Sequence, residues 1–516
     1  MKKYIVIPVL LIWVFSSCKK LQFDDPTTYT LEEGIEKTPD YYYKLASGNF
    51  SNALWNINSA YNFGYGISAL ADQTTVTNRV QEWWDFAIEP RKRLNNSLSY
   101  GGYLHFSSPY ASFYTPNLNA NVIIEALDKG AKGIDDKARD RTGEIYAIAY
   151  LIKGISLGYL GAIYDRGIIA NENLGTAGSK ALSNSYKEMI ESAMTYFDKA
   201  IAAASATSSM TVSDFYINVA LDKTKFIQLA NSLAARLLAS VPRDKAEAIA
   251  LGATFWNKVL AYANAGIKED IVVPYVSGGY YNYMAHYGLT EAGGGAYLPA
   301  DIKVAYFADK TGTYPSSYPL NESVTLGPVQ TDDARFAQYF KYSTNFGYLR
   351  VDRGRNLFSN YKHNRWSQGG TYPNTLTVTG YPNPIFLSEE IRLLKAEAKM
   401  WAGDIAGAAA ELNDPAADRI AKGGLPAIAV TEAAVRKTLH YEYAISIDVS
   451  GSVINPWVFM RRNDLLQPGT PTEFPNPEQQ LLLTPDPVYT FGGAEYAGEK
   501  GKWGETATAA ATSGWK

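Results

Sequence analysis

Two stretches of the chain combine aromatic rings with side chains that can hydrogen-bond hydroxyl groups. In the first, Trp83 and Trp84 closely follow Asn78 and Arg79. Tryptophan and tyrosine have an apolar face and a polar edge. A sugar suits such residues, because its C–H face packs on a ring while its hydroxyl groups need hydrogen bonds. These residue types predict non-covalent binding of a carbohydrate.

The second stretch, residues 276–288, places tyrosines and a histidine among glycines, where little regular structure forces the rings inward. A third position is Trp366, which follows Asn364 and Arg365. The alternative for all three is that the rings only pack loops onto the rest of the protein. The candidate ligand-binding residues are Asn78, Arg79, Trp83, Trp84, Tyr280, Tyr281, Tyr283, His286, Tyr287 and Trp366.

One stretch resembles a catalytic motif: residues 154–158 (GISLG) match the G-x-S-x-G pattern of serine hydrolases. That pattern requires a strand before the serine and a sharp turn at it. Here Ser156 lies inside a long helical pattern, and Gly154, Gly158 and Gly161 line one face of the helix. Glycines weaken a helix, so we interpret this row as the place where a neighbouring helix approaches closely.

Other catalytic signals are weak. No P-loop, dinucleotide-binding fingerprint or H-E-x-x-H motif occurs, and the histidines are isolated in sequence at positions 105, 286, 363 and 440. A glycosidase needs two carboxylates that face each other across a sugar. We interpret the adjacent pair Glu389 and Glu390 as a helix start, and Asp135–Asp136 and Asp332–Asp333 as solvated loop positions. The sequence predicts no enzyme, no cofactor and no metal site, but a pair of carboxylates distant in sequence remains open.

The composition and charge argue against some classes of binding partner. The chain has 516 residues with 38 Tyr and 10 Trp, and a formal net charge of −3. This mildly acidic balance argues against nucleic acid, whose phosphates require clustered Lys and Arg. No Pro/Gly/Ser-rich linker divides the chain, so one large domain over residues 41–516 is predicted.

The N-terminus resembles an export signal. Lys2 and Lys3 precede an apolar run from Ile5 to Phe15, which is too short to span a membrane. Two serines then precede Cys18, the single cysteine of the chain. We predict that residues 1–17 are a lipoprotein signal peptide, that Cys18 is lipidated, and that residues 18–40 form the anchor and tether. The alternative is an ordinary secretory signal with a chance cysteine.

Helical periodicity dominates the remainder. Helical pairs are predicted near residues 117–164, 186–263, 384–413 and 432–447, and residues 193–200 have the Ala-x3-Phe-x2-Ala spacing of a tetratricopeptide helix. We expect about four tetratricopeptide-like pairs, with a loop-rich insert at 271–381 and an irregular C-terminal part at 455–516. The fold class is therefore mostly α. Loops displayed on such a rigid scaffold are where binding residues concentrate.

The segment Asn383–Asn413 is predicted to be a helical hairpin. Pro384 sets its entry, Ser388 and the two glutamates after it supply N-terminal capping, and Gly403 ends the first helix. The run LLKAEAKMWAGD (393–404), followed by AAAELN (408–413), resembles the signature of the RagB/SusD family of nutrient-binding lipoproteins of Bacteroidota.

Further matches follow the order of the same family. WVFMRRNDLL (457–466) after the helix that contains Glu442, and TEFPNPEQQL (472–481), resemble its C-terminal segments, while Leu70–Asn96 resembles an early region of one subgroup. The matching positions in the C-terminal third are Glu442, Arg461, Arg462, Asp464 and Leu465. We expect these to form buried or half-buried ion pairs that hold the last helix to the body.

The resemblance implies a SusD-like fold on an outer-membrane lipoprotein exposed at the cell surface. It also implies a glycan ligand held by an arc of Trp and Tyr from the early and middle regions. The partner would be a SusC-type TonB-dependent transporter, which receives the captured nutrient. The alternatives are a surface hydrolase of glycans, a protein that binds peptide or another nutrient, and a scaffold that only docks partner proteins.

Overall fold

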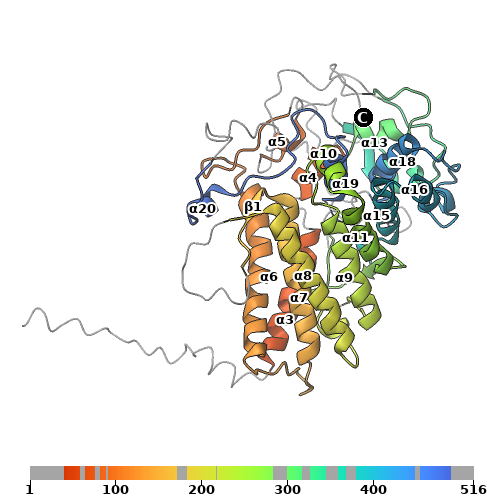
Figure 1. Cartoon of the computed structure of the whole chain (residues 1–516). Helices are drawn as coiled ribbons and strands as arrows, with labels where there is room; N and C mark the ends of the chain where they lie inside the picture. Colours follow the sequence, from red (N-terminus) through yellow and green to blue (C-terminus); the bar gives the residue numbers. More distant parts are fainter. Residues whose placement is uncertain are drawn as a thin grey trace, which may run out of the picture.

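The protein is mostly helical, which confirms the predicted fold class (Figure 1). The computed structural model describes residues 40–58, 64–75, 82–88, 91–170, 183–216, 218–282, 299–316, 326–343, 358–367, 379–447, 452 and 454–489. The predicted signal peptide, Cys18 and nearly all of the tether lie outside these residues, as do residues 490–516.

Long helices form the scaffold, and shorter ones cover it. The long helices are α3 (Tyr41–Ile57), α6 (Leu104–Asp128), α7 (Thr142–Ile163), α8 (Tyr186–Ala206), α9 (Lys223–Leu238), α11 (Gly252–Ala265), α15 (Ser388–Trp401) and α18 (Glu432–Ile445). The shorter helices are α4 (Tyr65–Leu70), α5 (Trp84–Ala87), α10 (Lys245–Ala250), α13 (Ile302–Ala308), α14 (Phe336–Tyr339), α16 (Ile405–Leu412), α17 (Asp418–Ala421), α19 (Asn455–Arg462) and α20 (Glu478–Leu481), with a 3₁₀ turn at Val212–Asp214.

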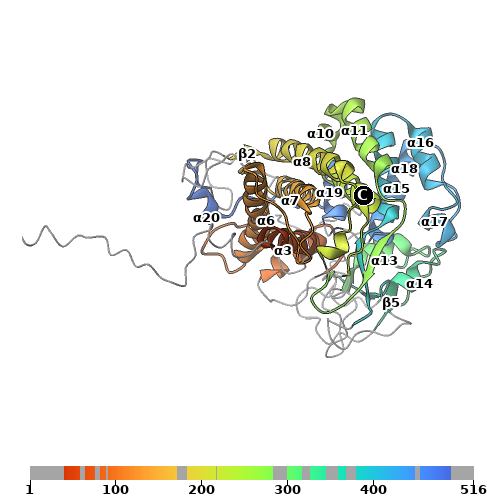
Figure 2. The ribbon, with the colours of Figure 1, turned by 90° about the horizontal axis from the view of Figure 1, so that it is seen from below.

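Successive helices pack side by side in one continuous array. Helix α7 packs on α6 and α8, α8 on α9, α9 on α11, α11 on α15, and α15 on α16 and α18. Seen from below, they follow an arc from α6 through α8 and α11 to α16 and α18 (Figure 2). Each helix thus buries an apolar stripe that it could not bury alone, as in repeat proteins.

Helix α7 is the centre of the array's first half. Among the described residues it is the one helix long and apolar enough to cross a membrane, but 89% of its most apolar window is buried within the protein. A helix that is apolar on every side belongs in a core. The row of glycines allows this packing, because a Cβ on Gly161 would lie 2.9 Å from the Tyr186 carbonyl oxygen at the start of α8. The predicted close approach of a neighbouring helix is confirmed.

The helical periodicity predicts one helix over residues 245–263 and a cap from Ser388 for the hairpin helix, and both details are wrong. Residues 245–263 form two helices rather than one, and Gly252 starts the second in a left-handed conformation (φ +65°) that favours glycine. The hairpin helix α15 begins at Ser388 without a side-chain cap of its own. Instead Asp270, from the preceding segment, accepts hydrogen bonds from the Ser388 backbone N–H (2.8 Å) and hydroxyl (2.7 Å).

The insert carries regular structure that periodicity did not predict. Strand β3 (Ile271–Pro274) pairs antiparallel with β7 (Pro382–Phe386), so the two ends of the insert meet directly before α15. Pro384 therefore lies in a strand and not at a helix entry. Within the insert, β4 (Pro299–Asp301), β6 (Phe358–His363) and β5 (Phe340–Tyr342) form an antiparallel sheet. A further pair joins β1 (Arg166–Gly167) to β2 (Asn184–Ser185).

Buried ion pairs hold the last helices to the body of the protein, as predicted for Glu442 and Arg462. Arg462 binds Glu397 of α15 at 2.7 and 2.5 Å, and Arg335 binds Glu442 at 2.7 and 2.9 Å. The prediction is wrong for Arg461, which donates to the backbone carbonyls of Ala162, Ser240 and Thr472. It is also wrong for Asp464, an exposed residue that accepts from the Lys245 backbone N–H (3.1 Å).

Candidate functional site

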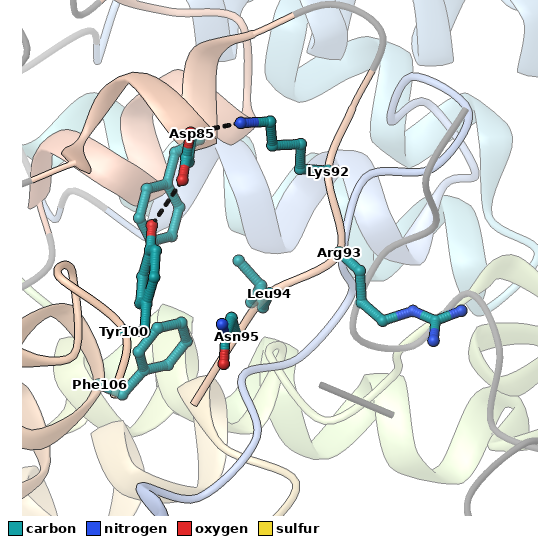
Figure 3. Close-up of a pocket in the computed structure, with 8 residues that line it drawn as sticks. Asp85, Lys92, Arg93, Leu94, Asn95, Tyr100 and Phe106 are labelled. Carbon is teal, nitrogen blue, oxygen red and sulfur yellow. Dashed lines mark hydrogen bonds and ion pairs between the residues drawn. The ribbon is translucent and has the colours of Figure 1, made fainter. Parts of the chain in front are cut away.

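A pocket of about 340 Å³ lies between the short helix α5 and the extended segment 91–97 (Figure 3). Its lining combines charged, amide and phenol groups with apolar side chains. The lining residues are Asp85, Phe86, Lys92, Arg93, Leu94, Asn95, Tyr100 and Phe106. The pocket is therefore lined by residues that directly follow Trp83 and Trp84, which belong to the first predicted cluster.

Three polar side chains form a connected group at the pocket wall. The Asp85 carboxylate accepts from Lys92 Nζ at 2.8 Å through one oxygen and from the Tyr100 hydroxyl at 2.8 Å through the other. Both contacts are visible at the top of Figure 3. Burial raises the pKa of Tyr100 far above its usual value, and the nearby Asp85 charge adds to this effect. Tyr100 therefore stays protonated and keeps its donor role at every physiological pH.

Apolar rings form the base of the pocket. Phe86 and Phe106 are fully buried, with ring centroids 6.3 Å apart, and both contact Phe474 from the C-terminal part. Leu94 is also buried. The pocket thus offers a small apolar surface next to a cluster of hydrogen-bonding groups, which is the usual composition of a small-ligand site.

The segment that carries Lys92, Arg93 and Asn95 is fixed at both ends by buried contacts. Arg91 forms an ion pair with Asp72 and donates to the Phe86 carbonyl at 2.8 Å. At the other end, Asn96 donates to the carbonyls of Asn476 (2.6 Å) and Tyr489 (2.9 Å). Because both anchors are buried, the polar side chains between them are held in place before any ligand arrives.

Of the first predicted cluster, the structure describes only Trp83 in atomic detail. Its ring is 4% exposed, packs edge-on against Tyr65 at 4.3 Å, and donates through Nε1 to His105 Nδ1 at 2.8 Å. In this position it supports the pocket from behind. Asn78, Arg79 and the side chain of Trp84 lie outside the described residues, so their contact with ligand stays a prediction.

The second predicted cluster is placed in part. Tyr280 is 0% exposed, and its hydroxyl accepts from Asn58 (2.6 Å) and donates to the Pro384 carbonyl (3.2 Å). Tyr281 is 6% exposed and packs edge-on against Tyr275 at 5.4 Å. As placed, these two rings pack the start of the insert onto the scaffold, so ligand contact would require them to move. Tyr283, His286 and Tyr287 lie outside the described residues.

The third position, Trp366, is half-buried beside Arg365, whose guanidinium lies 5.2 Å from its ring centroid. Arg365 also lies over Tyr339 at 4.4 Å and 3.7 Å from the Asp418 carboxylate. Trp366 is not among the residues that line the pocket at α5. The structure therefore does not bring it together with Trp83, and its role stays a prediction.

Sequence reasoning missed Asp85, Lys92 and Tyr100 as site residues. A signal existed, because Asp85 directly follows the tryptophan pair and Lys92 and Asn95 lie in the stretch that resembles an early family region. A sugar needs these polar groups as well as the aromatic rings. No sequence motif marks Tyr100 as a site residue, since its position at the pocket depends on the turn at residues 98–103.

Several of the carboxylates considered for catalysis have ionic partners, and the serine considered with them is buried inside a helix. Ser156 is buried in the middle of α7, as predicted. Glu390 binds Arg236 at 2.6 Å through both oxygens. The prediction of solvated loop carboxylates is correct for Asp136 and Asp332, which are exposed. It is wrong for Asp135 and Asp333, which are buried and paired with Arg139 and Arg335, because these carboxylates hold their own turns together. No group of three or more His, Cys, Asp or Glu suited to a metal ion occurs in the described part of the chain.

Comparison with known proteins identifies the fold. No protein-family profile matches the chain, and no curated protein sequence matches it. Among solved structures, the chain is similar to a SusD superfamily protein of Bacteroides vulgatus ATCC 8482 (TM-score 0.53, 12% identity, 86% of this chain and 89% of that chain covered).

Two further solved structures agree. A SusD-like carbohydrate binding protein of Bacteroides vulgatus ATCC 8482 matches with TM-score 0.55 and 13% identity, over 84% of each chain. A SusD/RagB family protein of Bacteroides thetaiotaomicron VPI-5482 matches with TM-score 0.52 and 14% identity, over 90% of this chain and 97% of that one. The chain thus has the SusD-like fold across almost its whole described length, as the resemblance predicted.

Proposed function

We propose that the protein belongs to the RagB/SusD family and captures an oligosaccharide at the cell surface. The observation that carries this proposal is the fold, which is shared along most of the chain with proteins described as SusD-like and carbohydrate binding. Because fold alone does not fix function, the proposal also needs a site with suitable chemistry. The pocket at α5 supplies one.

The pocket chemistry suits a polyol. Neighbouring hydroxyl groups of a sugar each donate and accept a hydrogen bond, and the group of Asp85, Lys92 and Tyr100 offers both an acceptor and donors within one small area. The adjoining apolar base suits the C–H face of a ring. A pocket of about 340 Å³ lies at the small end of ligand sites, so we propose that it holds one end of a longer chain.

We infer that binding occurs without turnover. Inverting and retaining glycosidases place two carboxyl groups on opposite sides of the scissile bond, whereas the pocket at α5 contributes Asp85 alone from the described residues. No cofactor enters the proposal. The runner-up is the same fold with a peptide or another nutrient as ligand, and a titration panel distinguishes the two.

The location and the partner are part of the same proposal. Residues 1–17 would direct export, Cys18 would carry the lipid, and residues 18–40 would tether the body to the outer membrane. The captured nutrient would pass to a SusC-type TonB-dependent transporter. The support for this is the N-terminal sequence together with the fold, since a lipidated tether keeps a capture protein next to a membrane transporter.

The test is calorimetric titration of residues 19–516, which contain every described residue, against a panel of oligosaccharides and peptides. We expect saturable binding of at least one oligosaccharide, with no change in its length after prolonged incubation. Asp85→Asn and Tyr100→Phe should weaken binding about tenfold, since each removes a hydrogen bond to a charged group. The matched control is Asp198→Asn on the distant helix α8. Shortened products would favour a hydrolase, and binding of peptides only would refute the glycan.

A further inference from the structure

A second and larger pocket, of about 590 Å³, lies on another part of the molecule. It is formed by helices α13 and α18 and by the turn that follows α19. Helices α13 and α18 lie at the right in Figures 1 and 2, whereas α20, which contacts the segment carrying the first pocket through Glu478 and Leu98, lies at the left. The two pockets share no lining residue. The second pocket is therefore a separate candidate site.

Aromatic rings form one side of this pocket. Tyr306 and Phe307 of α13 are half-buried, with ring centroids 5.9 Å apart. Phe307 packs edge-on against His440 at 4.7 Å, which fixes the ring from behind. Tyr441 is held by a hydrogen bond from its hydroxyl to Asp333 at 2.7 Å. These rings provide a firm, flat apolar surface that is only partly covered by the protein.

Two cations, Arg436 and Lys437, lie at neighbouring positions of α18, one turn before His440 and Tyr441. Arg436 stacks on Trp401 at 4.2 Å and donates through Nε to Glu432 and through Nη1 to Asn463, each at 2.7 Å. Its Nη2 makes no hydrogen bond to the described part of the chain. Lys437 is exposed and forms no ion pair or hydrogen bond with any described residue. The pocket thus presents the edge of a guanidinium group that is held by its neighbours and an exposed ammonium group.

Among the described residues that line the pocket, Asp309 is the one carboxylate, and its own turn already uses it. Asp309 ends α13, and its oxygens accept from the backbone N–H groups of Thr311 (3.3 Å), Thr313 (2.8 Å) and Tyr314 (3.1 Å) and from the Thr311 hydroxyl. Although burial acts against them, these hydrogen bonds hold the pKa of Asp309 below its usual value. Asp309 therefore remains an acceptor for its own turn, and the unused groups of the pocket are donors.

We propose that this pocket binds a small ligand that carries a carboxylate next to an apolar face, which is the ring of an aromatic acid or the C–H face of a uronic acid. The apolar face packs on Tyr306 and Phe307, and the carboxylate accepts from Lys437 Nζ and Arg436 Nη2. This assignment goes beyond the proposed function, because it concerns a different pocket and a charged ligand. It does not depend on whether the pocket at α5 binds a glycan.

The test compares matched pairs of probes that differ in the carboxylate. Residues 19–516 are titrated with phenylacetate against 2-phenylethanol, and with methyl glucuronide against methyl glucoside, with ligand-observed NMR as the readout. We expect an acid to bind and its neutral counterpart not to bind. The acid that binds identifies the apolar face as aromatic or saccharide. Equal binding of the neutral probe, or no binding of either acid, would overturn the proposal.

Variants place the binding in the pocket. Lys437→Ala should weaken binding of the acid about tenfold, as expected for loss of a charge-assisted hydrogen bond. Tyr306→Ala should weaken it similarly, with circular dichroism to show that the helices remain. The matched control is Lys258→Ala, an exposed lysine on α11 without a described partner, which should bind the acid as the unaltered chain does. Undiminished binding in Lys437→Ala would show that the acid does not bind in this pocket.

Discussion

At the scale of single residues, burial decides what each polar group can do. Tyr100 and Asp85 share a hydrogen bond at the rim of a pocket, so they can exchange partners with a ligand. Glu389 is in the opposite situation. It is buried at the start of α15, where Oε2 accepts from Arg392 (3.2 Å) and from the Asp418 backbone N–H (3.3 Å), while Oε1 has no partner among the described residues.

The environment of Glu389 predicts a pH-dependent stability. Burial, and then the charges of Asp418 and Glu442, raise its pKa to about 7. At pH values between the unfolded pKa of about 4.5 and the folded pKa of about 7, Glu389 is protonated in the folded state to a greater extent than in the unfolded state. The contribution of Glu389 is therefore fully present in acid and is lost as the pH rises from about 4.5 to about 7. The loss is on the order of 3–4 kcal/mol, at about 1.4 kcal/mol per pKa unit.

Denaturant unfolding at pH 5 and pH 8 checks this prediction. The difference in the free energy of unfolding between the two pH values should shrink in Glu389→Gln, because the amide does not ionise. Glu191→Gln, at an exposed position on α8, should leave the difference as it is. An unchanged difference in Glu389→Gln would show that Glu389 is already ionised at pH 5.

At the scale of elements, the close packing of α7 on α8 organises the first half of the array. The sequence predicted this contact because three glycines line one face of α7, and the period of a helix brings them together. It could not predict the break at Gly252 or the β3–β7 pair. Those features depend on a left-handed backbone conformation and on a pairing between residues more than 100 positions apart.

Gly161→Ala tests the close approach of the two helices. The added Cβ would meet Ile190 at 2.8 Å, Met189 at 2.9 Å and the Tyr186 carbonyl oxygen at 2.9 Å, so the backbone must shift. Overpacking of this kind should lower the free energy of unfolding by about 1–3 kcal/mol. Gly48→Ala in α3, where a Cβ meets nothing within 4 Å, should instead raise it by up to about 1 kcal/mol. Equal effects at both positions would contradict the packing argument.

At the scale of the whole molecule, the SusD-like fold was predictable from the order of several short motifs along the chain. The buried partners explain why those motifs are informative, since Glu397 in the hairpin binds Arg462 in the C-terminal run. The candidate site was predictable only as a region. Trp83 pointed to the correct segment, but its ring is buried, and the polar groups at the pocket depend on contacts between distant segments, such as Asn96 with Asn476.

The N-terminal sequence predicts that the protein is anchored to a membrane through Cys18. Cys18→Ala removes the sulfur that a lipid would occupy, so the variant should leave the membrane fraction and appear in soluble fractions. Fractionation, together with protease treatment of intact cells, measures both anchoring and surface exposure. A variant that remains in the membrane fraction would show that Cys18 is not the anchor and would favour an ordinary secretory signal or another attachment.

The protein is proposed to bind a glycan through the pocket at α5. A crystal structure of residues 19–516 with the oligosaccharide that titrates most tightly tests this proposal directly. We predict an intact sugar with hydroxyl groups within hydrogen-bond distance of Asp85, Lys92 or Tyr100, and with a ring over the apolar base. A sugar bound elsewhere, with this pocket unchanged, would contradict the assignment, and a failure of every oligosaccharide to bind would contradict the function.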